Sequence, residues 1–178
     1  MNEINVNGKP YYRIISNDIL NCSNKLEEYR ANNKPVRITQ HWTAGRYEQA
    51  FNDYQILIAN DYILLSKNPL NYREFQHTWK MNTSNIGISY MAMFNSKFPI
   101  LDNMLENMAK SLAVLVNFYK ISWDNVKDHK YFSDNSIPSS YGNETRIDVG
   151  GFTRKNAKKN IFLESIDKGK WYEEKYIK

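Results

Sequence analysis

Two of the three histidines in this chain stand where a catalytic base or a metal ligand would sit. His41 ends an alternating apolar run typical of a strand, and small, turn-forming residues follow it. His129 also ends a strand-like segment, and a polar stretch that reaches Glu144 and Asp148 comes after it. Two imidazoles and one carboxylate, with a fourth position left for water, make up the ligand set of a catalytic zinc ion. Spacing alone favours unrelated surface residues over such a shared site.

The elements that must position these side chains alternate between strands and helices. An extended entry segment is expected over residues 9–16, and strands over 35–41, 54–59, 62–66, 85–92 and 126–129. Helices are expected over residues 17–29, 46–52, 101–119 and 153–167, and loops over 67–83 and 131–144. Gly87, inside a strand pattern, indicates close approach of the backbone to a neighbour or a ligand. This order predicts an α/β fold, a central mixed β-sheet flanked by helices.

The chain has 178 residues, which predicts one domain over residues 1–178. Its net charge of +5 favours anionic partners such as nucleic acid, a membrane surface or a cell-wall polymer. Much of the charge lies in residues 154–159, where a solvated helix face is expected ahead of a nucleic-acid site. Cys22 is the single cysteine, so an intrachain disulfide is excluded, and it is expected to pack in the core. The sequence contains no run of about 18 apolar residues, so no membrane span is expected.

Five short motifs occur in a fixed order along residues 35–150, most of the expected domain. They are His41-Trp42-Thr43-Ala44-Gly45, Asp53-Tyr54-Gln55-Ile56-Leu57-Ile58, His77 with Asn82 and Asn85-Ile86-Gly87-Ile88, Asp128-His129, and Glu144-Thr145-Arg146-Ile147-Asp148. The ordered set resembles the zinc-dependent N-acetylmuramoyl-L-alanine amidases of the amidase-2 type. That superfamily also contains phage lysozyme-like amidases and peptidoglycan recognition proteins.

The resemblance implies a Zn²⁺ cofactor and a role for each matching residue. His41, His129 and Asp148 look like the three zinc ligands. Arg146 falls where relatives often carry a lysine that stabilises the oxyanion, and arginine supplies the same charge. Tyr54 matches a tyrosine that would hydrogen-bond the attacking water or the tetrahedral intermediate, although a tyrosine in a strand is usually a packing residue.

The substrate would meet a second group of residues. His77 and Asn82 lie in the loop where relatives contact substrate, although His77 is equally compatible with a plain surface histidine. Trp42 could line a groove for sugar and peptide, with ordinary packing as the simpler interpretation. Asp128 could orient a metal ligand, although a solvated charge is the simpler expectation.

The chain departs from the family pattern at two positions. Ser89 stands where some relatives carry a glutamate that acts as general base, so a carboxylate base is excluded there. Gln55 stands where many relatives have a histidine.

The function that the resemblance implies is hydrolysis of peptidoglycan. Zinc-activated water would cleave the amide between N-acetylmuramic acid and the L-alanine of the stem peptide. A non-catalytic peptidoglycan-binding protein of the same fold is one alternative, and a basic nucleic-acid-binding module that uses residues 154–159 is another.

The sequence fits more than one cellular setting. The residues after Met1 contain no apolar stretch of the kind found in secretory signals, so synthesis in the cytoplasm is expected. The enzyme would reach the wall after lysis or by dedicated export, as an endolysin or a delivered toxin does, or would act on muropeptides in the cytoplasm. A monomer is expected.

Overall fold

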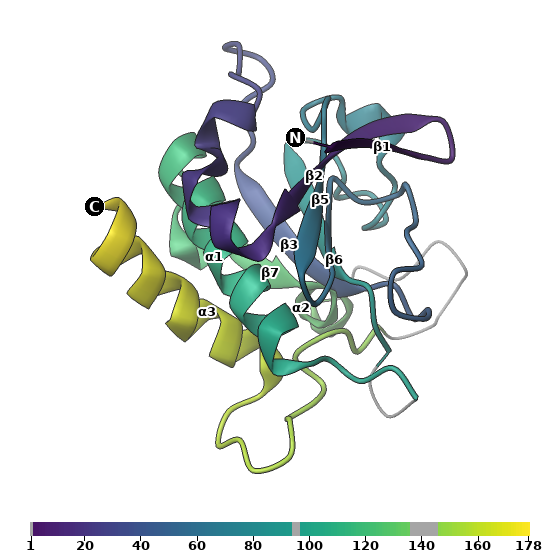
Figure 1. Cartoon of the computed structure of the whole chain (residues 1–178), viewed down its shortest axis with the longest axis vertical. Helices are drawn as coiled ribbons and strands as arrows, with labels where there is room; N and C mark the ends of the chain where they lie inside the picture. The colour runs from purple at the N-terminus through teal and green to yellow at the C-terminus, as the bar shows by residue number, and fades with distance from the viewer. Residues whose placement is uncertain (1, 94–96, 136–145) are drawn as a thin grey trace.

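A seven-stranded sheet forms the centre of the computed structural model, which describes residues 2–93, 97–135 and 146–178 (Figure 1). The strands lie in the order β1-β2-β5-β4-β6-β3-β7. Their bounds are β1 Asn2–Val6, β2 Lys9–Ile15, β3 Arg37–Trp42, β4 Ile56–Ile58, β5 Tyr62–Ser66, β6 Asn85–Tyr90 and β7 Val126–Asp128. The sheet is mixed, as the sequence predicts.

The sheet divides into an antiparallel part and a parallel part. Strands β1, β2 and β5 pair antiparallel, and β5 also pairs antiparallel with β4 after the turn at Asn60 and Asp61. Strands β4, β6, β3 and β7 run parallel to one another. The carboxyl ends of the parallel strands therefore meet at one edge, the usual place for a ligand site in such sheets.

One face of the sheet is covered by α1 (Asp102–Tyr119) and α3 (Ile161–Tyr172), which lie side by side (Figure 1). The apolar residues of α1 that face the sheet, including Met108 and Leu112, are buried and belong to one core cluster with Ile86 and Ile88 of β6. This burial removes a large apolar surface from water and is the main stabilising contribution to the fold.

Alternation along β3 sends its side chains to opposite faces of the sheet. Ile38 belongs to the cluster beneath the helices, and the Gln40 side chain donates to Ser165 Oγ of α3 at 2.7 Å. Thr39 and His41 therefore point to the other face. A smaller apolar cluster that includes Leu57 and Phe75 covers part of that face and leaves the β3 end to polar side chains.

The expected strands are confirmed, but several helix predictions are wrong. Residues 46–52 form turns instead of a helix, and the helix expected over 17–29 is a 3₁₀ helix, η1 (Ser16–Lys25). The last helix begins eight residues later than expected, because the Asn160 side chain caps it by accepting from Leu163 N. It ends at Tyr172, beyond the expected end at residue 167. The sequence prediction also missed β1.

The remaining short helices are η2 (Tyr72–Glu74), η3 (Trp123–Asn125), α2 (His129–Asp134) and η4 (Glu173–Ile177). Helix α2 occupies the start of the loop expected over 131–144, and residues 136–144 of that loop lie outside the described residues. Among the described residues, no helix is both long enough and apolar enough to cross a membrane.

Candidate metal centre

The register of two parallel strands brings His41 and His129 together. Gln40 of β3 pairs with Asp128 of β7, so the next residue of each chain segment lies at the same level of the sheet. The two imidazoles face each other with 3.1 Å between their Nδ1 atoms. His41 and His129, far apart in the sequence, thus meet at the carboxyl edge of the sheet. The sequence pattern predicted that each residue ends a strand, but not that the two strands are neighbours.

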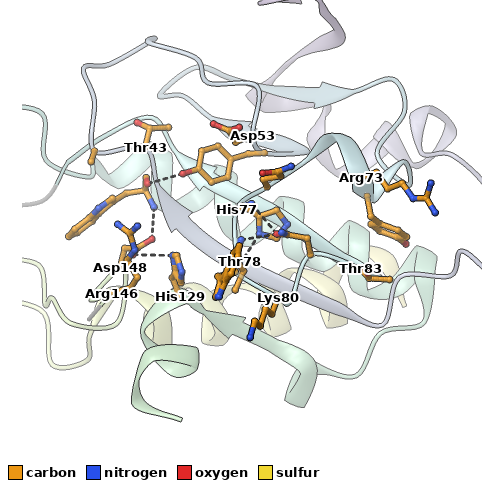
Figure 2. Close-up of a pocket in the computed structure, with 17 residues that line it drawn as sticks. Thr43, Asp53, Arg73, His77, Thr78, Lys80, Thr83, His129, Arg146 and Asp148 are labelled. Carbon is orange, nitrogen blue, oxygen red and sulfur yellow. Dashed lines mark hydrogen bonds and ion pairs between the residues drawn. The ribbon is translucent and has the colours of Figure 1, made fainter. Parts of the chain in front are cut away.

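Asp148 completes a cluster with the two histidines, and Figure 2 shows it beside His129. Its Oδ2 lies 3.5 Å from His41 Nδ1, and its Oδ1 lies 3.5 Å from His129 Nδ1. The backbone N–H of Trp42 also donates to Asp148 Oδ2, at 3.3 Å. All three expected ligands therefore lie in one cluster whose ligand atoms are within 4.8 Å of one another.

The spacing of these atoms fits a small divalent ion. Zinc held tetrahedrally at 2.0–2.1 Å requires ligand atoms about 3.3 Å apart. The Nδ1–Nδ1 distance of 3.1 Å and the two nitrogen–oxygen distances of 3.5 Å lie close to that value. The cluster can therefore hold a metal ion.

The protonation states suit metal binding as well. Burial lowers the pKa of His41 to about 4, although Asp148 acts in the opposite direction, so the imidazole is neutral near pH 7. Burial raises the pKa of Asp148, but hydrogen bonds with His129 and His41 outweigh it and hold that pKa well below its ordinary value. The site therefore offers a neutral imidazole and a carboxylate, as a zinc ligand set requires.

Asp128 ties together the two segments that carry His129 and Asp148. Its carboxylate accepts from Tyr131 N at 2.9 Å, which caps α2, and from Gly150 N at 2.7 Å, in the turn after Asp148. It is only 5% exposed, so the expectation of a solvated charge is wrong. Its two oxygens bond backbone N–H groups and not an imidazole, so it does not orient a metal ligand by bonding to the ring. A Cβ on Gly150 would come within 2.4 Å of Asp128 Oδ2, so this contact needs glycine.

His77 is buried directly against His41. Its Nδ1 lies 3.0 Å from His41 Nε2, on the side of the ring away from Asp148. The His77 ring fits against Gly87, where an added Cβ would be 2.5 Å from its Cγ and Cδ2. The close approach predicted at Gly87 is confirmed, with His77 as the neighbour. His77 also borders the cavity described below, and contact with substrate stays a prediction.

Asn82 shapes the loop that carries His77. Its Oδ1 accepts from His77 N at 3.0 Å and from Thr78 N at 2.8 Å. These two bonds account for the amide oxygen within the protein, and the residue still borders the cavity. The sequence reasoning missed Thr78, whose hydroxyl lies 2.9 Å from His77 Nδ1. Its position beside a histidine was the one signal that could have marked it.

The cluster opens into a polar cavity of about 730 Å³. Trp42, Tyr54 and Arg146 line it together with two of the candidate ligands, His129 and Asp148. Arg73 and Lys80 lie further along the cavity (Figure 2). The volume is within the range of small-molecule sites. The metal cluster therefore faces a space that can admit part of a ligand.

Tyr54 and Trp42 are fixed in the wall of this cavity. The Tyr54 ring lies 5.2 Å from the His41 ring, and its hydroxyl donates to the Trp42 carbonyl at 3.5 Å. The Trp42 ring packs on Phe152, with centroids 4.9 Å apart. Burial raises the pKa of Tyr54 above its ordinary value, so the phenol keeps its proton. Both residues pack and border the cavity at once.

The two departures from the family pattern have structural roles. Gln55 is fully buried and bridges β6 by accepting from Gly87 N at 2.7 Å and donating to Asn85 O at 3.2 Å. Ser89 is fully buried, and its hydroxyl donates to the Tyr90 carbonyl. Neither residue supplies a carboxylate to the site.

The basic stretch 154–159 is partly neutralised. Arg154 pairs with Glu164 and with Asp102, and Lys159 pairs with Asp167. These pairs lie at the start of α3 and across to α1. Residues 154–159 precede α3, so the expected helix face is wrong, although the ion pairs favour a structural role for these charges.

Comparisons with family models, with curated proteins and with solved structures found no match to this chain. The resemblance to the amidase-2 superfamily therefore stays a prediction from the sequence motifs, and the site has to be interpreted from its own geometry.

Proposed function

We propose that this protein is a zinc-dependent peptidoglycan hydrolase that cleaves the amide between N-acetylmuramic acid and L-alanine. The observation that carries the proposal is the cluster of His41, His129 and Asp148, of which His129 and Asp148 line an open polar cavity. Zinc bound there would supply Lewis acidity, polarising a carbonyl and lowering the pKa of water. Two imidazoles and one carboxylate leave a position free for a reactant, as catalytic zinc sites do.

Arg146 supplies positive charge beside the cluster. It lines the cavity, and its backbone N–H donates to Ser133 Oγ at 2.8 Å, which anchors the segment that leads to Asp148. The negative charge that develops on an amide oxygen during hydrolysis is stabilised by a cation held in a preorganised position. Arg146 is therefore assigned to the oxyanion.

Tyr54 orients the reacting groups without giving up its own proton at neutral pH. Its hydroxyl is near the Trp42 carbonyl, at 3.5 Å, and can turn toward the cavity to hydrogen-bond water or the tetrahedral intermediate. Within the described residues that line the cavity, Asp53 is the carboxylate outside the metal cluster. Asp53 is exposed to solvent, so this end of the cavity lets water deliver a proton to the leaving amine.

The lining of the cavity suits a peptide joined to a sugar. Arg73 and Lys80 can meet the carboxylates of a stem peptide, and the exposed Trp79 offers a flat apolar surface to a sugar ring. The net charge of +5 would draw the protein toward an anionic wall.

Mass spectrometry of the products from purified peptidoglycan tests the proposal. Zinc-loaded protein is expected to release intact stem peptides that begin with L-alanine. Chelation, or His129→Ala, is expected to stop the release. Trp171→Ala serves as the matched control, because that side chain is exposed on α3 and does not line the cavity, and it should keep full activity.

Two results would contradict the proposal. Full activity of zinc-free protein would exclude a metal role. Binding to peptidoglycan by zinc-loaded protein without any cleavage would favour the non-catalytic alternative instead. Running intact wall and soluble muropeptides in parallel also separates a wall-degrading enzyme from a recycling enzyme.

A further inference from the structure

A chain of buried polar contacts runs from the candidate metal site into the sheet. His41 Nδ1 faces Asp148 and His129, while its Nε2 lies 3.0 Å from His77 Nδ1. The other ring nitrogen of His77, Nε2, lies 3.3 Å from the backbone carbonyl oxygen of Asn85. Both imidazoles are buried, so these contacts are not exchanged for water.

The last contact in this series, from His77 to the Asn85 carbonyl, determines which ring nitrogens carry hydrogens. The Asn85 carbonyl can only accept, so His77 Nε2 must carry a hydrogen. His77 is buried, and its ring contacts an imidazole, a hydroxyl and a backbone carbonyl but no carboxylate, so a charged ring would be an unpaired buried charge. The neutral ring with its hydrogen on Nε2 has Nδ1 as an acceptor. His41 Nε2 must then be the donor between the two rings. In a neutral imidazole this leaves the lone pair on His41 Nδ1, which points at the metal site.

Thr78 does not change this assignment. Its hydroxyl lies 2.9 Å from His77 Nδ1 and 3.3 Å from His41 Nε2. The hydroxyl can donate its hydrogen to His77 Nδ1 while it accepts from His41 Nε2–H. The hydrogen on His41 is on Nε2 in both arrangements.

Several independent contacts hold His77 in its position. Gly87 leaves room for the ring, since a Cβ there would be 2.5 Å away. Asn82 Oδ1 accepts from His77 N, and Gln55 Nε2 donates to the same Asn85 carbonyl that His77 meets. A surface histidine that touched only substrate would need none of these contacts.

We propose that His77 is a positioning residue that fixes the tautomer and the ring orientation of His41, so that Nδ1 of His41 is presented to the metal ion. This inference rests on the metal centre of the proposed function. It assigns to His77 a role toward the protein's own ligand, where the sequence suggested a role toward the substrate.

Two measurements on the complete protein test this role. In ¹⁵N-histidine-labelled protein, NMR is expected to find the hydrogen of His77 on Nε2, both with and without zinc, and a hydrogen on Nε2 of zinc-loaded His41. Competition with a chelator then gives the zinc dissociation constant of each variant. His77→Phe removes the acceptor and is expected to raise that constant about 10- to 100-fold.

Control variants separate the hydrogen bond from simple packing. His77→Gln keeps an acceptor and a donor, and it is expected to retain most of the zinc affinity that His77→Phe loses. Thr78→Val keeps the shape of the side chain without the hydroxyl and should bind zinc within about threefold of the unchanged protein, since one neutral hydrogen bond contributes little.

The inference would be overturned by a hydrogen on His77 Nδ1, which is observable in the unchanged protein whatever the variants do. Unchanged zinc affinity in a folded His77→Phe protein would overturn it too. These failures differ from failure of the proposed function, in which zinc binds with the expected tautomers but peptidoglycan is not cleaved.

Discussion

The two halves of the candidate metal centre are built in different ways. His41 projects from a central strand, is 1% exposed and is held from behind by His77. His129 and Asp148 come from the first residue of a short helix and from a turn, and their side chains are 12% and 9% exposed. The strand-borne half is fixed by the sheet, whereas the loop-borne half depends on one carboxylate, Asp128. The difference predicts distinct consequences for changes on each side.

The largest expected effect concerns charge on the loop-borne half. Arg146→Met is expected to lower kcat about 10²- to 10³-fold, because the oxyanion loses its cation. Zinc affinity should change little, since Arg146 is outside the ligand set. Steady-state hydrolysis of a muropeptide together with zinc titration measures both. Arg146→Lys, which keeps the charge, should recover part of the rate, and an unchanged kcat in Arg146→Met would remove this role.

Asp128 tests whether the loop-borne half depends on one side chain. Asp128→Ala leaves the N–H groups of Tyr131 and Gly150 without their acceptor. We expect a loss of about 2–4 kcal/mol in the free energy of unfolding, together with weaker zinc binding. Urea denaturation and zinc titration check this. Asp128→Asn keeps one oxygen acceptor and should lose less. If both variants match the unchanged protein, another contact holds this half.

Gly87 offers a change to the strand-borne half that removes no polar atom. Gly87→Ala drives a methyl group against the His77 ring and is expected to cost about 1–3 kcal/mol of stability. Because His77 supports His41, zinc affinity should fall as well. Thermal unfolding and chelator competition report the two effects. Ser89→Ala, in the same strand, should leave zinc affinity unchanged, and an equal loss in both variants would argue against a specific contact with His77.

The smallest expected effect is a pH dependence of the metal-free protein. The folded pKa of His41 is about 4, below its ordinary value of 6.5, so the unfolded chain binds more protons between these values. Stability therefore falls as the pH drops through this window, with His41 contributing about 1 kcal/mol from about pH 7 to about pH 5.5. Urea midpoints measure the slope. His41→Gln should flatten it, and an identical slope in both proteins would contradict the assignment.

Local signals in the sequence predict part of the strand-borne half, but they do not predict that His77 supports His41. The alternating pattern before His41 places it at a strand end, and the glycine at 87 indicates a close neighbour, which is His77. The order of strands decides that β3 lies between β6 and β7, and this order depends on contacts between distant segments. The meeting of His41 with His129 could therefore be inferred only through the family resemblance.

The loop-borne half was harder to predict because short polar elements carry weak periodicity. A loop was expected where α2 forms. Asp128 is an aspartate at the N-cap position of this helix and accepts from Tyr131 N, three residues later, so its residue type was a usable signal. The burial of Asp128 could not be predicted, because it arises from Gly150, a partner distant in the sequence. The late start of α3 follows from the cap at Asn160, which the sequence reasoning overlooked.

The most direct test of the central claim is chemical labelling of new amino termini in purified peptidoglycan treated with zinc-loaded protein. Hydrolysis at the proposed bond is expected to expose the amine of L-alanine while the glycan strands stay intact, and the signal should disappear in Asp148→Ala. Folded, zinc-loaded protein that exposes no L-alanine amine, from intact wall or from muropeptides, would contradict the claim.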